Sequence, residues 1–179
     1  MLAGGRVDFN PAMEFELKSL SPESVPAALE RAMRYRLLNE PRQAESICRD
    51  VLEIDPDNVD ALVTLLLALT DQFERYHGTS GRRATELLDR LPDPYRRAYY
   101  AGVICEREGL ARLRRGGPGA GYAAYEGLRQ AMERYEEAEK IRPPGNDESI
   151  LRWNSCARVI QSEPGVRPQP QESFYPLLE

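Results

Sequence analysis

The stretch PRQAESICRDVLEIDPDNVDAL, residues 41–62, contains the pattern that decides the fold. Its first residue, Pro41, suits the first turn of a helix, where a missing amide proton costs nothing. Small or apolar residues then recur at spacings of four and three, and a proline follows five residues later: Ala44, Cys48, Val51 and Pro56. This spacing predicts one face of a helix that ends before the proline, with a second helix directly after it.

The same criteria predict seven helices and no convincing strand. We expect them at residues 22–39 (starting between 22 and 25), 41–54, 58–76, 82–91, 94–115, 122–141 and 147–162. The third is apolar around most of its girth, so it is expected to be covered on two sides and to lie at the centre of the core. Short turns between the helices predict an all-α fold of antiparallel helix pairs.

The helix expected at 94–115 carries a ridge of small residues. Ala98, Gly102, Cys105 and Gly109 follow one another at spacings of four, three and four. A ridge without bulk allows a neighbouring helix to approach closely. The spacing of residues 44, 48, 51 and 56 also returns later in the chain, at Ala131, Tyr135, Ala138 and Pro143. In both sets the second residue, Cys48 or Tyr135, is expected to fill the gap between two helices that cross closely.

These spacings resemble the tetratricopeptide repeat, a 34-residue helix pair with a small residue, an Ala-x3-Phe motif and a final proline. Ala32 and Tyr35 match its first helix, and the two sets above match its second. Ala84, Leu88 and Leu91 match more loosely. The resemblance implies a right-handed solenoid of about three repeats plus a capping helix.

The chain departs from the family pattern in two ways. Arg31 stands where leucine is usual, and Pro56 and Pro143 lie 87 residues apart, where two repeats would give 68. A longer loop at 78–83 and the longer helix at 94–115, with the glycine-rich loop at 116–121 after it, account for the surplus. We expect the last helix to close the solenoid, with four charged residues on its solvated outer side: Asp147, Glu148, Arg152 and Arg158.

The divisions expected are an extended arm at 1–20, the helical domain at 21–162 and a proline-rich tail at 163–179. Met13, Phe15 and Leu17 alternate with charged residues, which is typical of an extended segment with one covered face. Either this arm packs along the helices, within one chain or across a homodimer, or it is a frayed terminus.

Composition narrows the class of protein. No apolar run approaches the length of about 20 residues that spans a bilayer, and residues 1–10 contain no signal-peptide core. Three widely spaced cysteines are expected to be small buried hydrophobes in a reducing compartment. We therefore expect a cytoplasmic protein, and its net charge of −5 argues against nucleic acid as the main partner.

No motif indicates catalysis, a cofactor or a metal. His77 has no nearby cysteine or second histidine, and the two glycine-rich stretches lack the Gly-Lys-Ser/Thr of a phosphate loop. Glu136, Glu137 and Glu139 are expected on the solvent side of their helix.

The candidate partner-binding residues are Arg97, Tyr100, Arg107 and Arg114, which fall near one face of the helix at 94–115. One interpretation is a solvated helix face, with its arginines paired to Glu106 and Glu108. The other is a cationic strip that meets acidic side chains or a carboxylate, since arginine binds carboxylates bidentately. Arg112 and Arg115 add charge at its end.

The family resemblance implies a non-catalytic scaffold or adaptor that binds a peptide segment of another protein in its groove. The alternative is small-ligand or anionic-polymer binding in an arginine- and tyrosine-lined groove. Some members of the family hold a chaperone's C-terminal carboxylate with lysine and asparagine on their first helices. Leu29 and Met33 stand at the corresponding positions here, so that type of binding is not expected.

Overall fold

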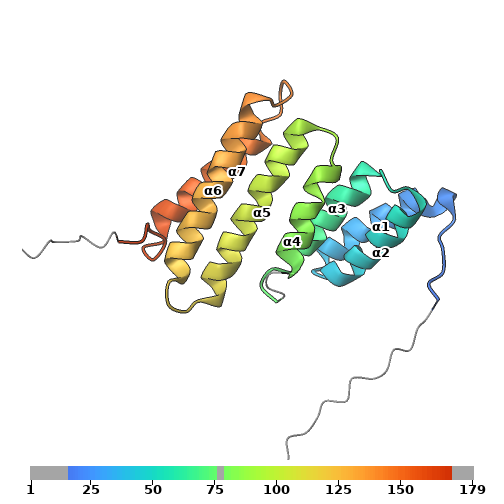
Figure 1. Ribbon diagram of the computed structural model, residues 1–179, viewed down its shortest axis with the longest axis horizontal. Coiled ribbons are helices and arrows are strands. Elements are labelled where there is room, and N and C mark those ends of the chain that lie inside the picture. The colour runs from blue at the N-terminus through green and yellow to red at the C-terminus, as the bar shows by residue number, and fades with distance from the viewer. Residues whose placement is uncertain (1–15, 76–78, 171–179) are drawn as a thin grey trace, which may run out of the picture.

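A computed structural model describes residues 16–75 and 79–170. This part of the chain is all-helical and contains no strand (Figure 1). Its α-helices are α1 (Val25–Leu37), α2 (Pro41–Ile54), α3 (Val59–Thr70), α4 (Thr79–Glu86), α5 (Pro94–Arg115), α6 (Ala120–Lys140) and α7 (Glu148–Ser162). Two 3₁₀ turns, Pro22–Ser24 and Leu88–Arg90, precede α1 and follow α4. The prediction of an all-α fold with seven helices is confirmed.

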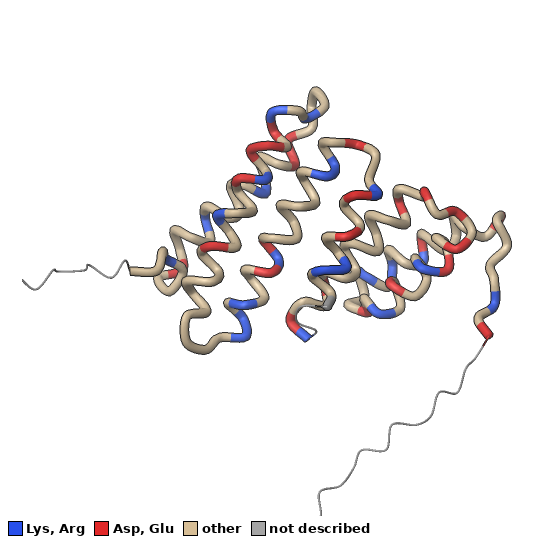
Figure 2. Tube along the Cα trace, viewed as in Figure 1, with Lys and Arg blue, Asp and Glu red and all other residues tan. Residues whose placement is uncertain are grey.

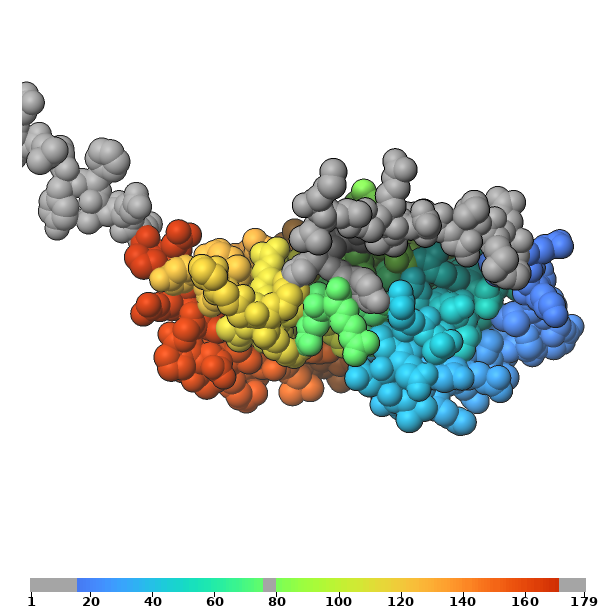
Figure 3. All heavy atoms as spheres, turned by 90° about the horizontal axis from the view of Figure 1, so that it is seen from below, coloured from blue at the N-terminus to red at the C-terminus, as the bar shows by residue number. Residues whose placement is uncertain are grey.

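The helices lie in series along the longest axis of the molecule. In Figure 1, α1 and α2 occupy one end, α3 and α4 follow, and α5, α6 and α7 lie at the other end. Consecutive helices pack on one another, with additional contacts between α1 and α3 and between α3 and α5. The space-filling view in Figure 3 shows the same progression from one end of the chain to the other.

Local signals start several of these helices. Pro41 is the first residue of α2, as expected. Asn58 caps α3, because its Oδ1 accepts a hydrogen bond of 2.9 Å from the Ala61 amide. Asp93 caps α5 in the same manner, accepting a bond of 3.0 Å from the Tyr95 amide, and Pro94 follows at the first helical position.

Helix α3 is shorter than predicted. It ends at Thr70 rather than near residue 76, because the chain tightens into i to i+3 hydrogen bonds. The Gln72 amide bonds to the Leu69 carbonyl and the Phe73 amide to the Thr70 carbonyl. The Thr70 hydroxyl also donates to the Leu67 carbonyl, at 2.8 Å. Phe73 is nevertheless buried, so the apolar periodicity continues past the end of the helix.

The buried apolar residues of the described part form two clusters. Helix α3, expected to be the central helix, packs on α1, α2, α4 and α5. The first cluster gathers residues of α1 to α4, with Ile104 and Ala111 of α5, and includes Leu66 of α3, which is fully buried. The second gathers residues of α5 to α7, with Tyr135 of α6 buried among them. Leu67 and Tyr100 pack against both clusters and join them.

The predicted close crossing on the small-residue ridge is confirmed. A Cβ atom on Gly109 would lie 3.1 Å from the Ala124 carbonyl oxygen and 3.4 Å from the Gly127 Cα. Ala131, Tyr135 and Ala138 are buried on the facing side of α6. Backbone atoms of α5 and α6 therefore approach one another where side chains of ordinary size would separate them.

The termini lie partly outside the described residues. Met13 and Phe15 are among those outside, so the expected arm is not tested there. Leu17 is 84% exposed within the single chain, so it is not covered by the helices of its own chain, and packing across a homodimer stays a prediction. Beyond α7, Val166 packs into the second cluster, so the tail begins as a segment docked on the helices. Within the described residues no helix combines the length and the apolar character needed to cross a membrane.

Candidate functional site

A groove of about 750 Å³ opens where one end of the first cluster meets α5. Its walls are the end of α1 with the start of α2, the end of α3 with the turn after it, the C-terminal half of α5, and one residue of α7. The lining residues are Arg36, Leu37, Asn39, Glu40, Pro41, Arg42, Gln43, Thr70, Asp71, Gln72, Phe73, Glu74, Arg75, Glu106, Arg107, Leu110, Ala111, Arg114 and Arg152. Helices α1, α3, α5 and α7 thus all contribute to it.

Asp71 binds two arginines from different helices. Its Oδ2 accepts a hydrogen bond of 2.8 Å from Nε of Arg36 on α1, and its Oδ1 pairs with Arg107 on α5. Arg107 also donates to the Thr70 hydroxyl, at 2.6 Å. Burial lowers the pKa of Arg107, and the charge of Asp71 opposes that shift. The carboxylate therefore connects three helices at the floor of the groove.

Glu106 is the buried acid of a second network. Only 4% of it is exposed, and it accepts hydrogen bonds of 2.6 Å from the Tyr135 hydroxyl and 3.0 Å from Arg152. Burial, together with the neighbouring charge of Glu106, raises the pKa of Tyr135. For Arg152 burial acts to lower the pKa, but the charge and hydrogen bonds of its neighbours raise it overall. This network ties α5, α6 and α7 together beside the groove.

The third arginine pair lies at the rim. Arg114 pairs with Glu74, and both side chains are about half exposed, at 61% and 49%. The next residue of α5, Arg115, donates to the Phe73 carbonyl at 2.9 Å. Basic and acidic positions are interspersed along the helices (Figure 2).

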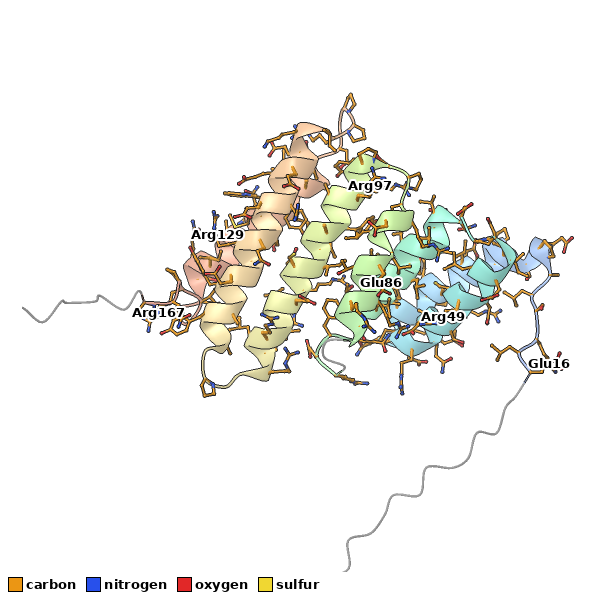
Figure 4. The ribbon with its side chains drawn as sticks, viewed as in Figure 1. Glu16, Arg49, Glu86, Arg97, Arg129 and Arg167 are labelled. Atoms are coloured by element: carbon orange, nitrogen blue, oxygen red, sulfur yellow. The ribbon has the colours of Figure 1, made fainter. Side chains whose placement is uncertain are left out.

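The structure separates the four predicted binding residues. Arg107 and Arg114 line the groove, but Arg97 and Tyr100 do not. Arg97 lies near the start of α5 (Figure 4) and donates to the Leu91 carbonyl at 2.7 Å, where it holds the turn before the helix. Tyr100 is partly buried between the two clusters. The four residues therefore do not form one strip.

The expected ion-pair partners on α5 are also corrected. Arg107 pairs with Asp71, and Arg114 pairs with Glu74, rather than with Glu106 or Glu108. Glu106 is buried because it shares the helix face of the small-residue ridge, four residues after Gly102 and three before Gly109. That spacing is the signal that would have found it.

Sequence reasoning missed four other residues of these networks. Arg36, Asp71 and Glu74 belong to no recognisable motif. Arg152 was expected on the solvated outer side of the last helix, but it turns inward to Glu106 and is 34% exposed. Its partner is 46 residues away along the chain, so no local pattern connects them.

The remaining candidate residues lie elsewhere. Glu136, Glu137 and Glu139 are exposed, as predicted, and Glu136 accepts a hydrogen bond of 2.9 Å from the Trp153 indole. Cys48 and Cys156 are buried, Cys105 is half-buried, and all three are free thiols. His77 lies outside the described residues. Within residues 16–75 and 79–170 no group of three or more metal-ligating side chains is placed to hold an ion.

Comparison of the sequence with protein-family models and with curated proteins finds no match. The groove and its networks are therefore the basis for a functional assignment.

Proposed function

We propose that the chain is a tetratricopeptide-like solenoid that acts as a non-catalytic scaffold and binds a peptide segment of another protein in the groove. One observation carries the proposal: α1, α3, α5 and α7, together with the first residues of α2, contribute to the same groove. A stack of the pairs α1–α2, α3–α4 and α5–α6, closed by α7, would present one helix of each pair on one side. Solenoids use such extended surfaces to bind partners.

The chemistry of the groove also supports a binding role. The carboxylates of Asp71, Glu74 and Glu106 are each held by arginine. A general base must be within reach of a proton on the substrate and poised to take it. Carboxylates already paired with guanidinium groups are better suited to hold helices in place and to set the charge of a surface.

The alternative of a small ligand or an anionic polymer rests on the arginines alone. Among the described residues that line the groove there is no tyrosine, so this part of the chain supplies the arginines of that alternative and not its tyrosines. The groove also contains the exposed apolar side chain of Leu37, which suits a peptide better than a polyanion.

A pair of exposed leucines provides the test. Leu37 lines the groove and is 88% exposed, whereas Leu151 of α7 lies outside the groove and is 66% exposed. The full chain would be used to select peptides from a displayed random library. A photoreactive phenylalanine analogue would then be placed at one leucine or the other. We expect the selected peptides to cross-link at position 37 and not at position 151. Failure to select any peptide, or equal cross-linking at both positions, would overturn the proposal.

A further inference from the structure

Positive charge is concentrated in the groove of an otherwise acidic chain. Six arginines line it, against four carboxylates, whereas the whole chain has a net charge of −5. The arginines are Arg36, Arg42, Arg75, Arg107, Arg114 and Arg152. Such a local surplus attracts carboxylates, which arginine binds with paired hydrogen bonds.

Four arginines of the groove form ion pairs with carboxylates of the chain itself. These ion pairs differ in how easily a carboxylate of a bound ligand could take the place of the protein's own. The side chains of Arg36, Arg107 and Asp71 are each no more than 24% exposed, and the side chain of Glu106, beside Arg152, is 6% exposed. Replacing these carboxylates would leave buried charges without partners, which is costly. Arg114 and Glu74 are already about half solvated, so exchange of this pair costs little.

Apolar surface lies in the same groove. Leu37 is largely exposed, and Pro41 and Leu110 are part of the lining. A bound segment would therefore gain from apolar side chains as well as from carboxylates, because burying apolar surface is favourable. A segment that contains both acidic and apolar residues can therefore contact the arginines and the apolar surface together.

We propose that the groove recognises an acidic peptide segment with interspersed apolar residues, that Arg114 is its principal carboxylate contact, and that Glu74 is the internal competitor for that contact. This inference rests on the proposed function and names the ligand class for the same groove. It also predicts that replacing Glu74 and replacing Arg114 change the affinity for the peptide in opposite directions.

The test uses the full chain and a fluorescein-labelled 12-residue peptide in which glutamate alternates with leucine and alanine. Fluorescence anisotropy measures its Kd for the parent, Glu74→Gln and Arg114→Gln. We expect Glu74→Gln to tighten binding by about two- to fivefold, since the competing carboxylate is lost. We expect Arg114→Gln to weaken it by about fivefold or more, since a charge-assisted contact is lost.

A second exposed arginine–glutamate pair provides the matched control. Arg82 and Glu86 on α4 are 77% and 65% exposed and lie outside the groove lining, and Figure 4 labels Glu86 on α4. Arg82→Gln and Glu86→Gln change the net charge by the same amounts. We expect both to leave the Kd within about 1.5-fold of the parent, because both side chains are more than half exposed, do not line the groove and are screened by salt.

Each outcome decides the proposal. Opposite shifts at residues 74 and 114, without shifts at 82 and 86, support it. Equal shifts of the Kd at both pairs would show a nonspecific charge effect and overturn it.

A different ligand is the second way in which the proposal can fail. Tighter binding of a uridine 12-mer than of the acidic peptide would overturn it in favour of nucleic acid. If library peptides cross-link at position 37 but are not enriched in acidic residues, and the labelled peptide does not bind, the acidic ligand is wrong and the scaffold function stands.

Discussion

The ring of Tyr135 lies directly against the backbone of Gly102. A Cβ atom on Gly102 would come within 2.5 Å of the Tyr135 Cε1 and 2.7 Å of its Cδ1. The ring cannot give way, because Tyr135 is only 1% exposed and its hydroxyl is bonded to Glu106. The crossing of α5 and α6 therefore depends on the absence of a side chain at position 102.

We expect Gly102→Leu to destabilise the protein by about 1–3 kcal/mol, the usual cost of overpacking a core. The measurement is the free energy of unfolding from urea titrations. Gly165→Leu is the control, since Gly165 is exposed and no atom lies within 4 Å of the position of its Cβ. Equal stability of the Gly102→Leu variant and the parent would show that the two helices are not held at this distance.

The elements that local signals specify were predictable. Helix α5 begins and ends where predicted, because Asp93 and Pro94 start it and Gly116, with a φ of 70°, ends it in a conformation that favours glycine. The end of α3 was not predictable in the same way. Phe73 keeps the apolar period of the helix while the backbone has already turned, so periodicity alone extends the helix too far.

A substitution at Leu66 tests the packing of α3 in the first cluster. This residue is fully buried, so Leu66→Asp would place an unpaired charge among apolar side chains and should cost several kcal/mol. Thermal unfolding followed by circular dichroism would show a large fall in Tm. Leu151→Asp is the control, because Leu151 is 66% exposed. A Tm within about 2 degrees of the parent's would contradict the central place of α3 in this cluster.

The candidate site was predicted only in part, because its contacts are long-range. Arg107 and Asp71 are 36 residues apart along the chain, and Arg152 and Glu106 are 46 apart. The nearby sequence is enough to predict which helix each of these residues belongs to and what charge it has. Which carboxylate each arginine meets depends on how the helices stack, which no spacing within one helix determines.

The buried network should show its energetic role through Glu106. Glu106→Gln would leave Arg152 without its carboxylate and weaken the hydrogen bond from Tyr135. We expect a loss of about 1–3 kcal/mol in the free energy of unfolding, typical of removing a charged hydrogen-bond partner. Glu137→Gln is the matched control. It breaks the Arg134–Glu137 pair, in which both side chains are about half exposed, and it should cost no more than about 1 kcal/mol. Equal costs for the two variants would mean that burial does not strengthen the network.

The buried thiols predict a loss of stability at alkaline pH. Burial raises the pKa of Cys48 and of Cys156 from 9.0 to about 12. Because the folded protein holds each thiol in its neutral form, the stability they contribute is fully present below pH 9. It is lost as pH rises from about 9 to about 12, where only the unfolded chain ionises freely. Each thiol then contributes up to about 1.4 kcal/mol per pH unit to the slope.

Replacement of one thiol isolates its part of that slope. Cys48→Ala lowers stability at every pH because it removes buried volume, so the quantity compared is the slope of unfolding free energy between pH 9 and 11 and not its value. We expect a shallower slope in Cys48→Ala than in the parent, and an unchanged slope in Ser46→Ala, an exposed position on the same helix. Burial also raises the pKa of Cys105 and Tyr135, which remain in all three proteins and act in the same direction. Identical slopes for Cys48→Ala and the parent would mean that the Cys48 thiol ionises in the folded protein as readily as in the unfolded chain.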